Sequence, residues 1–219
     1  LFLLAFSILG YVVSQPLLDL LMKLHPDPMT LVFLSPSEAF FARLKMALTV
    51  GFLTSYPLLV GQIWSFAREF MDRRLQVRTL LLIPVSYVLF LMGAAVAVFG
   101  VLPFALRFLL GFRSEDLKPM LSVSPYVSFV MAVVLPLALI FQMPVVVMFL
   151  ARLGILRPRT LASQRKHAIL LIFVIAAILT PPDGFSQILM AIPLVLLFEV
   201  SLLFARLAAP RNLDEGEDE

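Results

Sequence analysis

The sequence contains no cysteine, and only 14% of its 219 residues are charged. Without cysteine the chain forms neither a disulfide nor a thiolate metal site. The small charged share excludes an ordinary water-soluble domain, and a net charge of +3 does not favour nucleic-acid binding. Hydrophobic residues make up 61% of the chain and the mean hydropathy is +1.02, which indicates an integral membrane protein.

Six apolar runs predict membrane-spanning helices, because a span needs roughly 20 mostly apolar residues and none of the runs alternates like a strand. They cover residues 1–21, 46–66, 80–104, 126–150, 168–180 and 185–205. We therefore expect an all-α membrane protein with one six-helix domain at 1–206. An acidic, disordered tail at 207–219 follows it.

Two of the runs are unusual. The first begins at Leu1 without a basic flank or a cleavage site, so we expect a truncated span and not a signal peptide. The fifth has 13 residues, which is about 20 Å of helix. It crosses a bilayer only if the membrane thins or polar flanks move inward.

Proline interrupts several of the runs, and each proline removes a helix hydrogen bond and favours a kink. The positions are Pro57, Pro84, Pro136, Pro144 and Pro193. They predict a cupped bundle with curved walls. The alternative is a straight bundle that tolerates its prolines, as many membrane helices do.

Lysine and arginine gather in alternate loops. Eleven of the 17 basic residues follow the second or fourth run or lie in the tail, and six lie in the other loops. Because cytoplasmic loops carry the excess of Lys and Arg, both termini are expected to be cytoplasmic.

No enzyme motif is present: the sequence has no P-loop, no GxSxG and no HExxH. The orientation assigns His25 and His167 to opposite sides of the membrane, so they cannot share a metal ion. We expect no catalytic residue, no metal and no cofactor.

Four polar side chains lie within or beside the spans, at Gln142, Thr180, Gln187 and Glu199. Such groups are costly in lipid and usually face a partner or a cavity. Gln142 is equally suited to joining two helices of the same chain. Glu199 can also reach the interface or pair with Arg206 or a loop base.

The segment before the second run resembles a capping box. Ser35 suits the cap, Pro36 the first turn and Glu38 the third helical position, so a helix is expected to begin here and to continue into the second run. This structural role is a sufficient explanation for Glu38.

The loop after the second run mixes acids and bases, at Glu69, Asp72, Arg73 and Arg74. It is either a solvated face with the bases of a cytoplasmic loop or a docking surface for a charged peptide.

Motifs along the whole chain resemble the TatC family, the polytopic receptor subunit of the twin-arginine protein translocase. They are Pro36-Ser37-Glu38-Ala39-Phe40, Gln62-x-Trp64-x-Phe66, Pro103-Phe104, Ser128-Phe129, Thr180-Pro181-Pro182-Asp183 with Ser186-Gln187, Ala191-Ile192-Pro193 and Phe198-Glu199. The Thr180–Asp183 turn, expected on the outer face, is the most specific of them.

The resemblance implies a function. TatC-like proteins bind the paired arginines of signal peptides on folded cargo and assemble with the single-span proteins TatA and TatB. Transport is driven by the proton-motive force, in the bacterial inner membrane or in a thylakoid or mitochondrial inner membrane. By the same resemblance, Thr180 and Gln187 would meet the TatA or TatB helix, and Pro36, Glu38, Pro181 and Asp183 would shape the outer side.

The sequence departs from the family pattern in three places. The family's N-terminal cytoplasmic segment does not precede Leu1, Leu75 stands where the family has a signal-binding Glu, and Gln142 stands where a Glu is frequent. Asp72 and Glu69 are therefore the candidates for signal contact. Two alternatives stay open: a TatC-like scaffold that has lost signal recognition, and a small-molecule transporter.

Overall fold

The computed structural model describes residues 2–23, 31–32, 35–70, 76, 80–111, 121–179 and 184–208. Within these ranges the regular elements are helices, apart from two strands of two residues each. It divides into two compact units. The first comprises Leu1–Val60 with Leu91–Ala138, and the second comprises Gly61–Phe90 with Leu139–Glu219.

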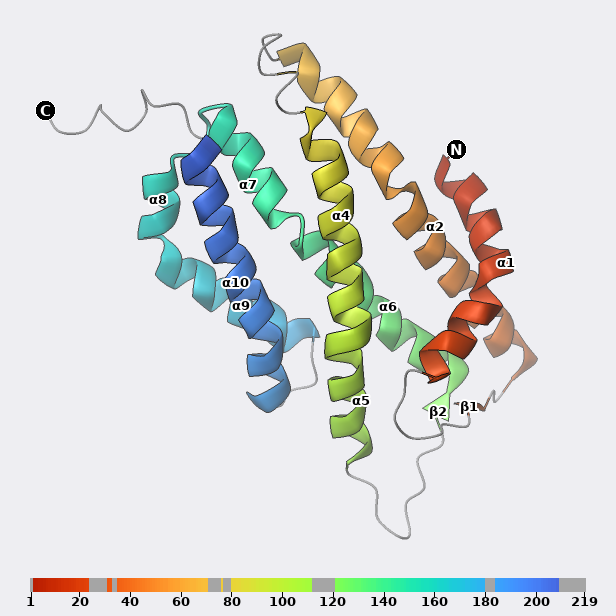
Figure 1. The fold of residues 1–219 in the computed structure, drawn as a ribbon. Coiled ribbons are helices and arrows are strands. Elements are labelled where there is room, and N and C mark those ends of the chain that lie inside the picture. The colour runs from red at the N-terminus through yellow and green to blue at the C-terminus, as the bar shows by residue number, and fades with distance from the viewer. Residues whose placement is uncertain are drawn as a thin grey trace, which may run out of the picture. The chain divides into compact units, whose positions relative to one another are not determined.

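The first unit is built on α1 (Phe2–Lys23), the first part of α2 (Pro36–Ala67) and most of α6 (Val123–Ile140). The strands β1 (Leu31–Val32) and β2 (Leu121–Ser122) pair in parallel just before α2 and α6 (Figure 1). This short pairing brings the N-terminal ends of α2 and α6 together, although 84 residues separate Glu38 from Ser122.

Small residues bring α1 and α2 into close contact. A Cβ atom on Gly51 would lie 2.7 Å from the Cα of Ser7, and one on Gly10 would lie 2.6 Å from the carbonyl oxygen of Ala47. Backbones approach this closely only where side chains are minimal, as in the small-residue seams of membrane helices. This seam is what holds α1 against α2.

The next long helix changes its winding, and its residues from Leu91 onward belong to the first unit. α4 (Leu82–Ala95) continues through the π-helical turn η2 (Val96–Val101) into α5 (Leu102–Leu110). Pro103 lies in the first turn after η2 and lacks the N–H that an α-helix needs. The wider π-helical turn before it lets the helix continue past this proline.

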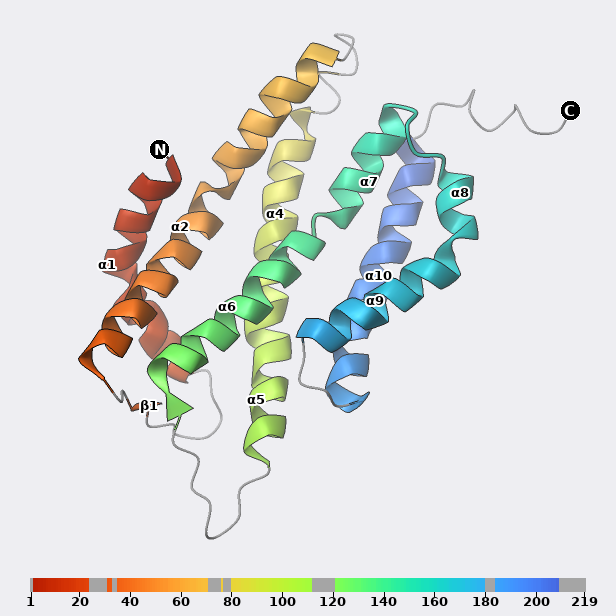
Figure 2. The same cartoon turned by 180° about the vertical axis from the view of Figure 1, so that it is seen from behind.

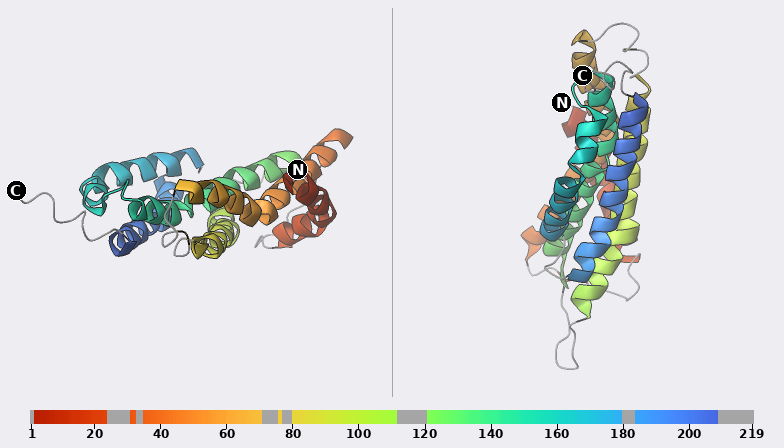
Figure 3. Two further views of the ribbon diagram at one scale, coloured as in Figure 1. Left: turned by 90° about the horizontal axis from the view of Figure 1, so that it is seen from above. Right: turned by 90° about the vertical axis from the view of Figure 1, so that its left-hand side faces the viewer.

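The second unit is organised around α10 (Gly184–Ala208). It packs against α7 (Met143–Arg152), α8 (Pro158–Ser163) and α9 (Arg165–Leu179), as Figures 2 and 3 show. Val147, Ala151 and Ala205 form a buried cluster between α7 and α10. A 3₁₀ turn, η1 (Arg68–Phe70), follows the end of α2.

Two features set the ends of α7. α6 stops at Ile140, and Phe141 and Gln142 form a turn before α7, because Pro144 cannot donate the next helical hydrogen bond. At the other end of α7, Gly154 has φ 73°. Its N–H bonds the carbonyl of Ala151, and the N–H of Ile155 bonds that of Leu150, which is a Schellman motif.

Three of the five prolines expected inside helices lie there. Pro57, Pro136 and Pro193 lie inside helices. Pro84 was expected to interrupt a span, but it lies in the first turn of α4, where its missing N–H costs nothing.

Four stretches of the described residues are long and apolar enough to cross a membrane: Pro36–Phe66, Leu82–Phe108, Val123–Arg152 and Gln187–Ala208. They contain the predicted second, third, fourth and sixth runs or nearly all of them. The predicted runs at 1–21 and 168–180 are helical, as α1 and α9, without being among these four.

Candidate functional site

The end of α2 carries Glu69, the one predicted signal-contact residue that the structure describes. Glu69 lies in η1 and is exposed. Trp64, one turn earlier, packs edge-to-face on Phe149 of α7 with ring centroids 6.5 Å apart. The Gln76 side chain donates to the carbonyl of Arg68 at 2.9 Å, which ties the far side of the loop to η1. Asp72, Arg73 and Arg74 lie outside the described residues, as does Leu75.

Glu199 on α10 forms an ion pair with Arg165, the first residue of α9, at 2.9 Å. The partner is thus a base of the loop after the fourth run and not Arg206. Both side chains are nearly half exposed, at 44% and 46%. Water screens such a pair, so it contributes little to the stability of the fold.

Gln142 is buried and bonded to α4. Its Oε1 accepts from the Ser86 hydroxyl at 2.5 Å, and its Nε2 donates to the Ser86 carbonyl at 3.2 Å. The amide therefore uses a donor and an acceptor on a single residue, and no charge is buried. Gln142 was expected either to face a partner or cavity or to join two helices of the same chain. These hydrogen bonds join two helices of the same chain.

Gln187 on α10 donates through Nε2 to the carbonyl of Phe173 on α9 at 3.0 Å. This bond joins the first turns of α10 to the middle of α9. Thr180, Pro181 and Asp183 are outside the described residues.

Glu38 takes part in a polar contact that the sequence did not predict. Its carboxylate accepts from the Ser122 hydroxyl and, at 3.1 Å, from the backbone N–H of Ser124. α2 does begin at Pro36, but the Glu38 N–H bonds the Ser35 carbonyl, and the Ser35 hydroxyl contacts that of Ser37. The helix therefore begins where the sequence predicted, and the Glu38 carboxylate reaches across to the start of α6.

Lys45 extends this network two turns along α2. Its ammonium group donates to Ser128 at 2.7 Å and to Ser124 at 3.4 Å. Sequence reasoning missed the contact. The one available signal was the spacing of Ser124 and Ser128, which places both hydroxyls on one face of a helix.

The described residues contain no group of three or more His, Cys, Asp and Glu side chains placed to hold a metal ion. Gln142 and Glu199 bond to side chains of neighbouring helices, and Glu38 bonds to Ser122 of β2 and to the first turn of α6. Such an arrangement positions helices and offers an acidic group, Glu69, to a partner at the end of α2.

Comparison with known proteins decides the family. The family model of the Sec-independent protein translocase protein TatC matches residues 1–193. The chain belongs to the TatC family.

Relatives within this family are similar over nearly the whole chain. TatC of Carboxydothermus hydrogenoformans is 37% identical over 94% of this chain and 87% of its own length. TatC of Aquifex aeolicus is 40% identical over 91% of this chain and 83% of its own length. Both proteins are described as Sec-independent protein translocase proteins.

Two crystal structures of the twin-arginine translocase receptor TatC have the same fold. The first superposes with a TM-score of 0.77 at 38% identity, covering 94% of this chain and 92% of that one. The second, determined in DDM, gives 0.81 at 36% identity, covering 95% and 93%. As a TatC-family member, the chain is a membrane-embedded core subunit of the twin-arginine translocase and not an enzyme, as the sequence motifs predicted.

Proposed function

We propose that this chain is the receptor of a bacterial twin-arginine translocase and binds the Arg-Arg pair of signal peptides on folded cargo. The observation that supports this most is the exposed Glu69 directly after α2, in a chain of the TatC family. Assembly with TatA and TatB into an oligomeric complex, and transport driven by the proton-motive force, belong to the same proposal.

The proposed topology has six spans in one domain, residues 1–206, with both termini and the tail at 207–219 on the cytoplasmic side of the inner membrane. The excess of Lys and Arg in the loops after the second and fourth runs supports it. α1 and α9 then serve as the first and fifth spans. α9 has 15 residues, about 22 Å of helix, so it crosses only a thinned bilayer.

In the proposed signal site, Glu69 and Asp72 accept hydrogen bonds from the two signal guanidinium groups. A carboxylate binds a guanidinium through two parallel hydrogen bonds, which the single ammonium of lysine cannot reproduce. Arg73 and Arg74 belong to the same proposed signal-binding segment. The contacts of Trp64 and Gln76 keep η1 in place at the end of α2.

The proposed partner sites lie on the last two spans. Thr180 and Gln187 face the single helix of TatA or TatB, while Gln142 and Glu199 keep the receiving helices in register. Among the described residues nothing donates to the Gln187 side-chain oxygen, which leaves it as an acceptor for a partner helix. Pro36, Glu38, Pro181 and Asp183 shape the outer side of the assembly.

Photo-crosslinking tests the receptor proposal. A photoreactive residue at position 69 or 72 is expected to label a signal peptide with Arg-Arg, and a Lys-Lys peptide of otherwise identical sequence is the control. We expect the Lys-Lys peptide to give several-fold less product, since it forms no bidentate contact.

The opposite result would support a different role. If both positions label the two peptides equally, or neither, while the chain still copurifies with TatA or TatB, the chain is a scaffold without signal recognition. TatC-like proteins usually carry the signal-binding acid at the position of Leu75. Because leucine cannot bind a guanidinium group, the crosslinking result decides between the receptor and the scaffold.

A further inference from the structure

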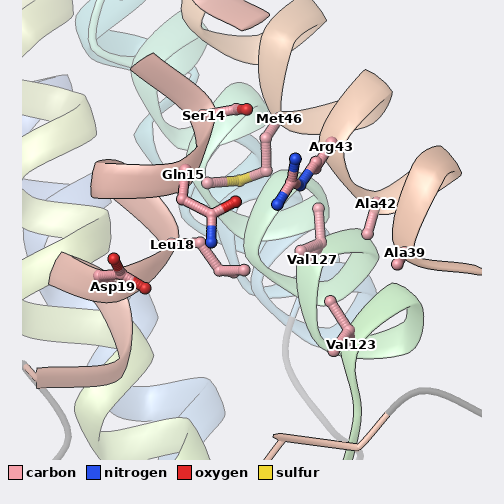
Figure 4. Close-up of a pocket in the computed structure, with 10 residues that line it drawn as sticks. All are labelled: Ser14, Gln15, Leu18, Asp19, Ala39, Ala42, Arg43, Met46, Val123 and Val127. Atoms are coloured by element: carbon pink, nitrogen blue, oxygen red, sulfur yellow. The ribbon is translucent and has the colours of Figure 1, made fainter. Parts of the chain in front are cut away.

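A pocket of about 190 Å³ opens within the first unit, between α1, α2 and α6. Figure 4 shows Arg43 reaching from α2 toward Gln15 of α1, with Asp19 one turn further along α1. Leu18, Met46, Val123 and Val127 supply an apolar wall. The pocket therefore has one polar side, which carries both a cation and an anion, and one apolar side.

Both charges in the pocket are exposed, and neither forms an ion pair with any residue in the described ranges. Gln15 makes no hydrogen bond with the described residues, so its amide is available to a ligand. The Ser14 hydroxyl donates to the Tyr11 carbonyl at 2.7 Å and keeps its oxygen as an acceptor.

In the proposed topology, the pocket lies where three helices meet the membrane boundary. Asp19 is near the C-terminal end of α1, which ends at Lys23. Arg43 is in the third turn of α2, and Val123 begins the apolar stretch of α6. Polar lipid headgroups occupy this depth, with acyl chains directly below them. The polar side of the pocket therefore suits a lipid headgroup, and its apolar side suits acyl chains.

We propose that this pocket binds a phospholipid whose headgroup carries a primary ammonium group, of the phosphoethanolamine type. The phosphate lies on the Arg43 guanidinium and the Gln15 amide, and the ammonium group donates to the Asp19 carboxylate. The acyl chains follow Leu18, Met46 and Val127 into the bilayer. In the proposed topology this site belongs to the outer leaflet.

The separated charges are the reason for choosing this occupant. A purely anionic lipid would satisfy Arg43 and be repelled by Asp19, while a free phosphate would leave the apolar wall uncovered. A choline headgroup has no N–H to donate to the carboxylate. A whole helix is about 10 Å wide and does not enter a pocket of this volume.

Lipid retention measures the preference. The full chain is purified from bilayers containing equal amounts of phosphatidylethanolamine, phosphatidylcholine and phosphatidylglycerol, and the retained lipids are counted by native mass spectrometry. We expect phosphatidylethanolamine to be enriched severalfold. Arg43→Gln should reduce its retention by about tenfold, the scale of one charge-assisted hydrogen bond.

Asp19→Asn separates the two charges. It removes the ammonium partner and keeps the phosphate partner, so the preference over phosphatidylcholine should fall to about one and phosphatidylglycerol retention should rise. Arg107→Gln is the matched control, because Arg107 is an exposed arginine of the same unit that does not line the pocket. It should retain lipid as the unchanged chain does.

Leu18→Trp tests the pocket without altering charge. The larger side chain fills the apolar side of the pocket and should abolish lipid retention. This test does not depend on the stability of the Arg43→Gln variant. Thermal unfolding of each variant shows whether it is still folded. Equal retention of the three lipids by the unchanged chain overturns the proposal. Undiminished retention in Arg43→Gln, or crosslinks from position 43 to a partner helix or a second copy in place of lipid, would overturn it as well.

Discussion

Gly154 ends α7 in a conformation that a side chain makes unfavourable. Its φ of 73° places it in the left-handed region, where an L-residue costs about 1–2 kcal/mol. The Schellman hydrogen bonds of Gly154 and Ile155 depend on that conformation. One glycine thus sets the direction in which the chain leaves α7 for α8.

Gly154→Ala is expected to lower the melting temperature of the solubilised chain by roughly 2–8 °C, given 2–4 °C per kcal/mol for a chain of this size. Gly61→Ala is the control, because Gly61 is inside α2 and its added Cβ meets nothing within 4 Å. It should be neutral or slightly stabilising, since alanine favours a helix. Equal losses for the two variants would refute the capping role.

The Ser86–Gln142 link can be measured by a double-mutant cycle with Ser86→Ala and Gln142→Leu. Because polar pairs in membrane proteins contribute about 0.6 kcal/mol on average and up to 1.7, a coupling energy in that range is expected. Gln62→Leu, an exposed amide on α2, is the control and should show no coupling to Ser86. A coupling near zero between Ser86 and Gln142 would mean that the pair adds nothing to the packing.

At the scale of elements, the contact between α1 and α2 depends on missing side chains. Gly10 and Gly51 allow backbone atoms to approach where a Cβ would come within 3 Å of its neighbours. The two helices therefore have one well-defined register, since sliding either of them would bring larger side chains into the seam. The same seam sets the spacing between α1, which carries Asp19, and α2, which carries Arg43.

Gly51→Val should separate α1 from α2 and cost about 1–3 kcal/mol, the usual effect of overfilling a packed site. The measurement is thermal unfolding, combined with retention of phosphatidylethanolamine, which should fall with it. Gly61→Val places the same side chain in open space on the same helix and should change both by much less. If the two valines act alike, the seam is not what orders α1.

At the scale of the whole molecule, the helices were predictable because apolar runs mark them directly. The third run, predicted at 80–104, corresponds to the stretch Leu82–Phe108, and the start of α2 at Pro36 was predicted from its local residues. The partners of the polar groups were not. Ser86 and Gln142 are 56 residues apart, and Lys45 and Ser128 are 83 apart. Pairing over such distances depends on which helix faces which, and periodicity does not carry that information.

The shortness of α9 belongs to this scale, because it concerns the membrane around the protein. If the 15-residue helix works by thinning the bilayer, inserting four or five leucines into it should impair export of an Arg-Arg cargo. The control replaces two exposed residues of α9 by leucine, Val174→Leu with Ile178→Leu. It changes the composition of the helix but not its length, so export should be unaffected. Normal export by the lengthened protein would exclude the thinning hypothesis.

The amide at position 142 has a further consequence for energy coupling. A glutamate there could take up and release a proton, whereas glutamine has no proton to exchange at any physiological pH. Both ends of this amide are, moreover, engaged by Ser86. If a proton gradient drives this translocase, Gln142 cannot bind and release the transported proton. The pH dependence of export by this chain should therefore show no titration step that arises from position 142.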